Sequence, residues 1–152
     1  MTTTNRSYTS RRSNIVEALA QKLKDINGAG AFLSDLQNNV HPRLKFWDEV
    51  DQFPAIHLNA GSETREYLGA GQRHRFLSVT IRCYVRSEDA PDDLDRLLED
   101  VETVIETHSS LKYKDRLGAE HTTHQITIVS IDTDEGVLEP LGVGEMLIDV
   151  RY

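Results

Sequence analysis

"FLSVTIRCYVR", residues 76–86, alternates apolar and polar side chains along its whole length. In an extended chain successive side chains point to opposite faces, so this stretch gathers its apolar residues on one side. The apolar face has Leu77, Val79, Ile81, Cys83 and Val85, and the other has Ser78, Thr80, Arg82, Tyr84 and Arg86. The alternation predicts a β-strand with one face in the core and the other in solvent or against a partner.

A hairpin is predicted on the N-terminal side of this strand. Ile56 and Leu58 alternate with polar or small neighbours in "FPAIHLNAGSETREYL", residues 53–68, which favours a second strand. "YLGAGQRHRF", residues 67–76, joins the two strands. A glycine-rich phosphate loop would lead into a helix, whose N-terminus holds the anion. A strand follows here instead, so the glycines indicate a hairpin tip.

Two amphipathic helices are predicted from apolar residues at helical spacing. The first spans 13–26, with Asn14 and Glu17 as its capping box and "NGAG" at 27–30 as its stop signal. The second lies in "SEDAPDDLDRLLEDVETVIETHSSL", residues 87–111. Its apolar stripe comprises Leu94, Leu97, Leu98, Val101, Val104 and Ile105. The aspartates of its first turn complement the helix dipole, and the later carboxylates are expected on a solvated face.

Two more strands are predicted in the last third of the chain, roughly at 124–133 and 144–152. Segment 31–53 is expected to hold one short strand, with Phe46 and Trp47 docked on the core. The order is therefore helix–strand–strand–helix–strand–strand. This order predicts an α+β fold, in which two helices pack on one face of a mainly antiparallel four- to five-stranded β-sheet.

The length of 152 residues suits one domain. Residues 1–12 are polar and are expected to form a flexible N-terminal arm, followed by a single α+β domain over 13–152. No apolar stretch approaches the roughly 18 residues of a membrane span, so we expect a soluble chain with no membrane partner. Cys83 is the only cysteine, which excludes an internal disulfide and a cysteine-based zinc site.

No catalytic, cofactor-binding or metal site is predicted. His121 and His124 are three residues apart, a spacing that places side chains on opposite faces of a strand. They are expected to be solvated or partly packed. No arrangement of Ser, His and Asp suggests a nucleophile, and the net charge of −8 counts against tight binding to a phosphate backbone. We therefore expect a protein that is not an enzyme and needs no cofactor.

Two long stretches carry a resemblance to a known family. They are "FWDEVDQFPAIHLNAGSETREYLGAG", residues 46–71, and "FLSVTIRCYVRSEDAPDDLDRLLEDVETVIE", residues 76–106. "FPAI" at 53–56, Gly61 and Glu63 are the most specific positions of the first stretch. Together these stretches resemble the tail terminator (tail completion) proteins of long-tailed bacteriophages, well over 40–108 and by element order elsewhere.

The resemblance implies a structural role in the virion. Proteins of this kind have two helices against one face of a sheet and assemble as a hexameric ring. The ring caps the tail tube, stops its polymerisation and presents a surface to the head completion or connector protein, and DNA later passes through the bore. The implied partners are further copies of the chain, the tail tube protein and the head completion protein. The implied location is the head-proximal end of the tail, after assembly in the host cytoplasm.

Contact surfaces for such a ring are predicted on the hairpin and on the polar face of the sheet. The candidates for contact with a neighbouring subunit or the tube are Arg65, Tyr67, Arg73, His74, Arg75, Arg82, Tyr84 and Arg86. Segment 109–123 matches no part of the family pattern and is expected to be a loop that reaches a partner.

Three other hypotheses stay open at this point. One is a head–tail connector protein within the same assembly. Another is a small α+β ligand-binding or enzymatic domain, which predicts a concave apolar pocket. A nucleic-acid-binding module is the least favoured, because the polar face of the strand has one aromatic residue, Tyr84, where stacking platforms present several.

Overall fold

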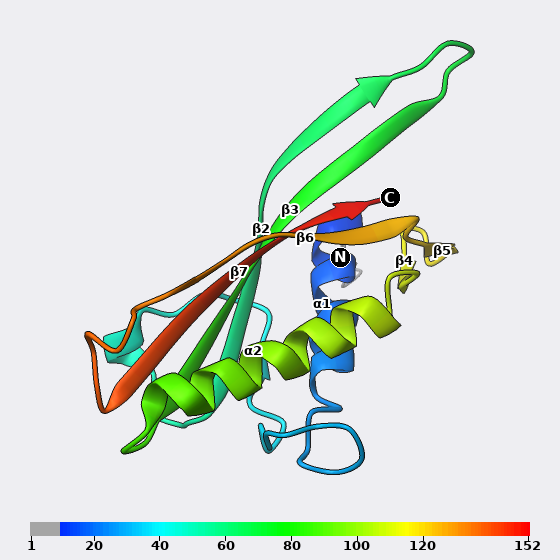
Figure 1. Cartoon of the computed structure of the whole chain (residues 1–152). Coiled ribbons are helices and arrows are strands. Elements are labelled where there is room, and N and C mark those ends of the chain that lie inside the picture. The colour runs from blue at the N-terminus through cyan, green and yellow to red at the C-terminus, as the bar shows by residue number, and fades with distance from the viewer. Residues whose placement is uncertain (1–9) are drawn as a thin grey trace, which may run out of the picture.

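A five-stranded sheet forms the centre of the computed structural model, which describes residues 10–152 (Figure 1). The strands lie in the order β1-β2-β3-β7-β6. Their bounds are Val40–His41 for β1, Ala55–Tyr67 for β2, Arg73–Arg86 for β3, Gln125–Thr133 for β6 and Leu141–Arg151 for β7. The predicted α+β class is confirmed. The sheet is mixed, because β1 pairs parallel to β2 whereas the other neighbouring strands are antiparallel.

The strand predicted from apolar alternation, β3, lies at the middle of the sheet. Leu77, Val79 and Ile81 are fully buried, and the facing residues Met146, Ile148 and Val150 of β7 are buried with them. Each apolar side chain therefore packs beside an apolar neighbour on the adjacent strand. These paired side chains form the part of the core that the sheet contributes.

Two helices complete the core, α1 (Arg11–Leu23) and α2 (Ala90–Thr107). The apolar residues of both belong to the same buried cluster as those of β3 and β7. Helix α2 contacts β3 and β7, whereas α1 contacts β1, β2 and β4 (Figure 1). Gly144 allows close contact between α2 and the sheet, since a Cβ there would lie 3.1 Å from Leu94 Cδ1.

The first helix begins two residues earlier than the sequence predicts. Ser10 is its N-cap and forms a capping box with Ser13, so the predicted box of Asn14 and Glu17 is wrong. A serine hydroxyl can both donate and accept, which lets Ser13 replace the usual Glu at this position. Arg11 and Arg12 therefore belong to the helix, and the rest of the predicted arm, residues 1–9, lies outside the described residues.

Segment 31–53 holds the one short strand that was predicted, β1, and also the 3-10 helix η1 (Trp47–Glu49). The prediction that Phe46 and Trp47 dock on the core is wrong, because they are 66% and 46% exposed. The backbone of this segment is what anchors it. The Tyr84 hydroxyl donates to the Lys45 carbonyl at 2.5 Å, and His57 Nδ1 lies 3.0 Å from the Arg43 carbonyl oxygen.

Segment 109–123 forms a small antiparallel sheet, β4 (Lys112–Lys114) with β5 (Glu120–Thr122). Tyr113 is buried between this hairpin and the domain, and Asn14 Nδ2 donates to the Lys114 carbonyl at 2.7 Å. The hairpin is thus attached to α1. Neither helix of the described residues has the length and apolar character needed to cross a membrane.

Candidate assembly surfaces

The hairpin of β2 and β3 extends away from the helices beyond a bulge between Ala60 and Glu63 (Figure 1). Its pairing continues to Tyr67 and Arg73, and the tip closes with a hydrogen bond from Leu68 N to the Gln72 carbonyl at 2.8 Å. Ala70 and Gly71 have positive φ angles of 61° and 75°, which a tight reversal requires. The predicted hairpin tip is confirmed, and β3 follows it where an anion site would need a helix.

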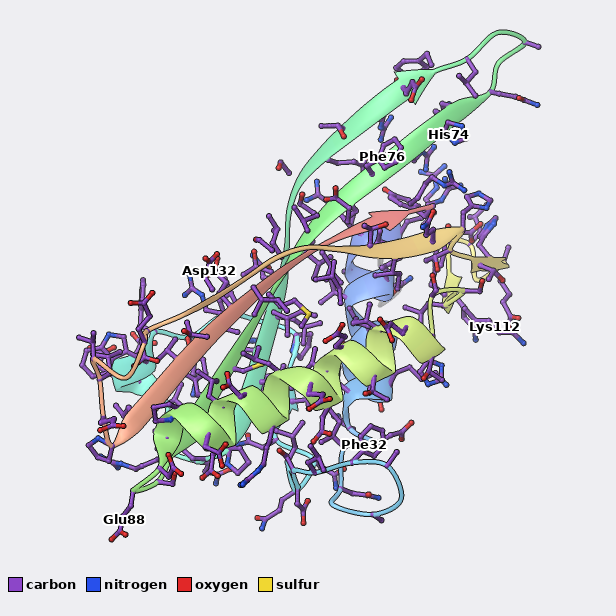
Figure 2. All side chains as sticks on the ribbon, in the orientation of Figure 1. Phe32, His74, Phe76, Glu88, Lys112 and Asp132 are labelled. Atoms are coloured by element: carbon purple, nitrogen blue, oxygen red, sulfur yellow. The ribbon has the colours of Figure 1, made fainter. Side chains whose placement is uncertain are left out.

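The candidate contact residues of the hairpin lie in two groups. Tyr67, which is 70% exposed, and Arg73 project at the free tip. His74 and Arg75 are half-buried, and Figure 2 shows His74 beside Phe76 on the same strand. Arg65 Nε contacts Glu63 Oε2 at 2.8 Å, so its charge is partly compensated within the chain. The tip is therefore the part of the hairpin that is free for a partner.

The base of the hairpin is joined to the C-terminus through Glu63. The Tyr152 hydroxyl donates to Glu63 Oε1, and Arg12 donates to the Gly61 carbonyl. Burial, followed by the hydrogen bond to Glu63, raises the pKa of Tyr152 to about 12. Burial opposes ionisation of Glu63, but hydrogen bonds from Tyr152 and Arg65 outweigh it and lower the pKa of this carboxyl. A neutral phenol bound to a carboxylate thus holds the hairpin base in place.

A groove of about 390 Å³ lies between the hairpin, β4, β5 and the start of α1. We call it the basic groove and define it by Arg11, Arg73, Arg75, His121, His124 and Tyr152. The guanidinium carbon of Arg75 lies 5.5 Å from the centroid of the Tyr152 ring, which is cation–π geometry. His121 Nε2 contacts Asp115 Oδ2 at 2.8 Å, and this contact lowers the pKa of Asp115. Among the described residues that line the groove, none is acidic.

The polar face of the sheet is less available for contact with a partner than its sequence indicates. Tyr84 is 1% exposed because segment 42–54 covers it, and burial raises the pKa of its hydroxyl. Arg82 Nε contacts Glu145 Oε2 at 3.1 Å, whereas Arg86 is exposed with its guanidinium 5.7 Å from the Phe53 ring centroid. Of these three candidates, Arg86 is the most accessible in the single chain.

A concentration of carboxylates lies at the N-terminal end of α2. We call it the acidic end and define it as residues 88–95 and 132–139, neither of which contains Lys or Arg. The two segments are neighbours, since a Cβ on Gly136 would lie 3.5 Å from Pro91 Cγ. Arg96 offsets part of this charge through contacts with Asp92 at 2.6 Å and Asp93 at 3.2 Å. Sequence reasoning noted the helix-turn aspartates but missed that the second segment joins them.

Asp100 is a second feature that the sequence did not reveal. It is 1% exposed and accepts hydrogen bonds from Leu33 N at 2.9 Å and Ser34 N at 2.7 Å. This carboxylate holds the connection after α1 against α2. Its role is structural, because every contact that it makes here is to the backbone of the chain's own loop.

The histidines differ in burial and in their neighbours. His57 is 3% exposed, burial lowers its pKa, and its ring stacks on His41 at a centroid distance of 4.9 Å. His121 is half-buried and His124 is exposed, as expected from their spacing. Within residues 10–152, no group of three or more His, Cys, Asp or Glu side chains is placed to hold a metal ion.

Comparison with known proteins assigns a family to this arrangement. The family model described as Bacteriophage Tail Tube Terminator Protein matches residues 6–152. The chain belongs to this family. A curated relative, the tail tube terminator protein of Escherichia phage T5, is 31% identical over 151 residues, which cover 93% of this chain and 92% of the relative. The resemblance noted in the sequence is therefore confirmed.

A solved structure shares the fold of this tail terminator family member. The chain is similar to one in the virion of a native gene transfer agent particle, with a TM-score of 0.61 and 10% identity. The similarity covers 93% of this chain and 96% of the other. At this identity the comparison speaks to the fold alone.

Proposed function

We propose that this chain is a structural virion protein that caps the tail tube as a ring, ends tube polymerisation and forms the tail-side surface for head attachment. The observation that carries the proposal is the match of the tail tube terminator family over residues 6–152. The 31% identity to the phage T5 terminator over nearly the full length of both chains supports it. The role is non-catalytic.

The ring consists of copies of this chain, and six copies are the expected number. The hairpin tip, which extends away from the helices, is available for contacts between the copies. The exposed candidates among the predicted contact residues are Arg65, Tyr67, Arg73 and Arg86. The partners of the ring are the tail tube protein on one side and the head completion or connector protein on the other. DNA meets it only in transit through the bore, and no membrane is involved.

An epitope-labelled chain tests this proposal in a phage that makes tails but no heads. Electron microscopy of the isolated tails should show label at one end of each tube, the end that would receive the head. Tubes made without the chain should vary in length and often exceed the normal length. Label along the tube, at the host-facing tip, or absent from headless tails would contradict the proposal.

The same preparation separates the terminator from a head–tail connector. A terminator joins the tube before the head arrives, so headless tails already carry it. A connector that enters with the head is missing from them. The tail tube terminator names of the family and of the phage T5 relative support the first assignment.

A further inference from the structure

The charged surfaces of this chain lie at opposite ends of α2 (Figure 1). A helix rises 1.5 Å per residue, so the 18 residues of α2 span about 27 Å. The acidic end lies at the helix N-terminus, and the basic groove lies beyond its C-terminus, where β4 and β5 follow. Figure 2 shows Glu88 and Asp132 toward one end of the molecule, and Lys112 and His74 toward the other.

The helix dipole explains the presence of only some carboxylates of the acidic end. Aspartates in the first turn of α2 are stabilised by the positive end of the dipole. The carboxylates of 132–139 belong to the end of β6 and the turn that follows it, and this turn packs beside the same helix terminus. Like charges held together destabilise one another. Arg96 contacts two of them, and Arg86 lines the same pocket as Asp93, so two cations offset part of the repulsion. A cationic partner would relieve this repulsion.

The basic groove has the complementary construction. Its cations are Arg11 of the helix and Arg73 and Arg75 of the hairpin, and the imidazoles of His121 and His124 line the groove beside them. Arg75 is half-buried, and its guanidinium packs against the Tyr152 ring at the wall of the groove. A positioned guanidinium loses less side-chain entropy when it binds a carboxylate. The groove is therefore a built surface for an acidic partner.

We infer that the basic groove of one copy binds the acidic end of the next copy in the ring. This inference rests on the proposed ring. Because the two surfaces differ and lie at opposite ends of the chain, their contact is head-to-tail, the kind that generates rings when its rotation closes. Complementary patches of this kind also steer association and reject wrong orientations.

A second copy fits the groove better than a passing DNA duplex. Each copy supplies one basic groove and one acidic end, so the surfaces match in number along a ring. The net charge of −8 opposes accumulation of the chain on a phosphate backbone. DNA contact is therefore the outcome against which the inference is tested.

Charge reversal tests the pairing in cells infected by a phage that lacks its own copy of this chain. The groove variant carries Arg73→Glu and Arg75→Glu. The acidic-end variant carries Glu88→Lys and Glu139→Lys, two exposed side chains of the acidic end. The control variant carries Glu99→Lys and Glu106→Lys, which make the same charge change on exposed positions of α2 outside both surfaces.

Each charge-reversed variant alone should lower the number of capped tails and infectious particles about tenfold or more, because the substituted side chains then face like charges on the next copy. The control variant should assemble like the natural chain. Co-expression of the groove variant with the acidic-end variant should restore assembly. In an alternating ring, the two introduced carboxylates of one copy again face the two introduced ammonium groups of the next. A single chain carrying all four substitutions should assemble for the same reason.

Three results would overturn the inference. Assembly by the groove variant alone would show that the groove does not bind the acidic end of the neighbouring copy. Failure of both the co-expressed pair and the fourfold variant, with circular dichroism and melting temperatures like those of the natural chain, would show that the surfaces do not meet. Binding of a DNA duplex that the groove variant loses and the acidic-end variant keeps would assign the groove to nucleic acid.

These results are distinct from failure of the proposed function. If the labelled natural chain lies at the head-proximal end of the tail while charge swapping fails to restore assembly, the terminator assignment stands and the pairing falls. If the natural chain lies elsewhere, both fall.

Discussion

At the residue scale, buried polar side chains fix the loops of this domain. Asp100 accepts hydrogen bonds from two consecutive backbone N–H groups, those of Leu33 and Ser34. Sequence pattern alone does not reveal this role, because Asp100 falls in a helix where many carboxylates face solvent. Tyr84 shows the same limit. Its position in the alternation predicts a polar face, and only the distant segment 42–54 makes that face a buried one.

Asp100→Ala should lower the free energy of unfolding by about 1–2 kcal/mol, since it leaves two part-buried N–H groups without their acceptor. The melting temperature should fall by several degrees. Asp100→Asn keeps one acceptor oxygen, so its free energy of unfolding should lie between those of the natural chain and Asp100→Ala. Asp95→Ala, on an exposed position of the same helix, is the matched control for urea and thermal unfolding. Equal stability of the Asp95 and Asp100 variants would refute this role.

The ionisation of Tyr152 should make the stability of the domain depend on pH. Its pKa is raised from 10.0 to about 12, so its stabilising contribution is complete below pH 10 and is lost as the pH rises toward 12. Tyr152→Phe should cost at most about 1 kcal/mol at neutral pH through the lost hydrogen bond to Glu63.

The stability difference between the natural chain and Tyr152→Phe should shrink between pH 10 and pH 12. Urea unfolding at several pH values measures it, and tyrosinate absorbance follows the ionisation. Tyr67→Phe, at the exposed hairpin tip, is the control. A difference that stays constant across this pH range would count against the Tyr152–Glu63 contact.

At the element scale, the regular periods of the sequence predict the long elements well. Strict alternation predicts β3, and the apolar stripe predicts α2 within a few residues at each end. The small hairpin of β4 and β5 escapes such analysis, because strands of three residues are too short to show a period. The predicted burial of Phe46 and Trp47 is wrong for another reason. The core is already filled by side chains of α1 and α2, so a large side chain elsewhere need not be buried.

The contact of α2 with the sheet depends on small residues of β7. A Cβ on Gly142 would lie 2.7 Å from Val85 Cγ2 and 3.2 Å from the Ala90 carbonyl oxygen. Gly142→Ala should therefore destabilise the domain by about 1–3 kcal/mol through overpacking. Gly69→Ala, with no atom within 4 Å of the added Cβ, should change stability by less than about 0.5 kcal/mol. Thermal unfolding of both variants decides it, and equal melting temperatures would contradict the close approach.

At the scale of the whole molecule, the separation of charge is the property that the sequence conceals. Composition shows an acidic chain with a net charge of −8. It does not show that 132–139 lies against 88–95, or that Arg11, Arg73 and Arg75 meet in one groove, because these residues are far apart along the chain. The family, in contrast, is recognisable from local stretches, and the match over 6–152 confirms it.

The central claim is that copies of this chain form the ring that ends the tail tube. An electron cryomicroscopy map of the head-proximal end of the tail tests it most directly. The map should contain a ring of this α+β fold directly on the last layer of tube protein, with the acidic end of each copy against the basic groove of its neighbour. A tube end without this fold, or the fold at another position in the virion, would contradict the claim.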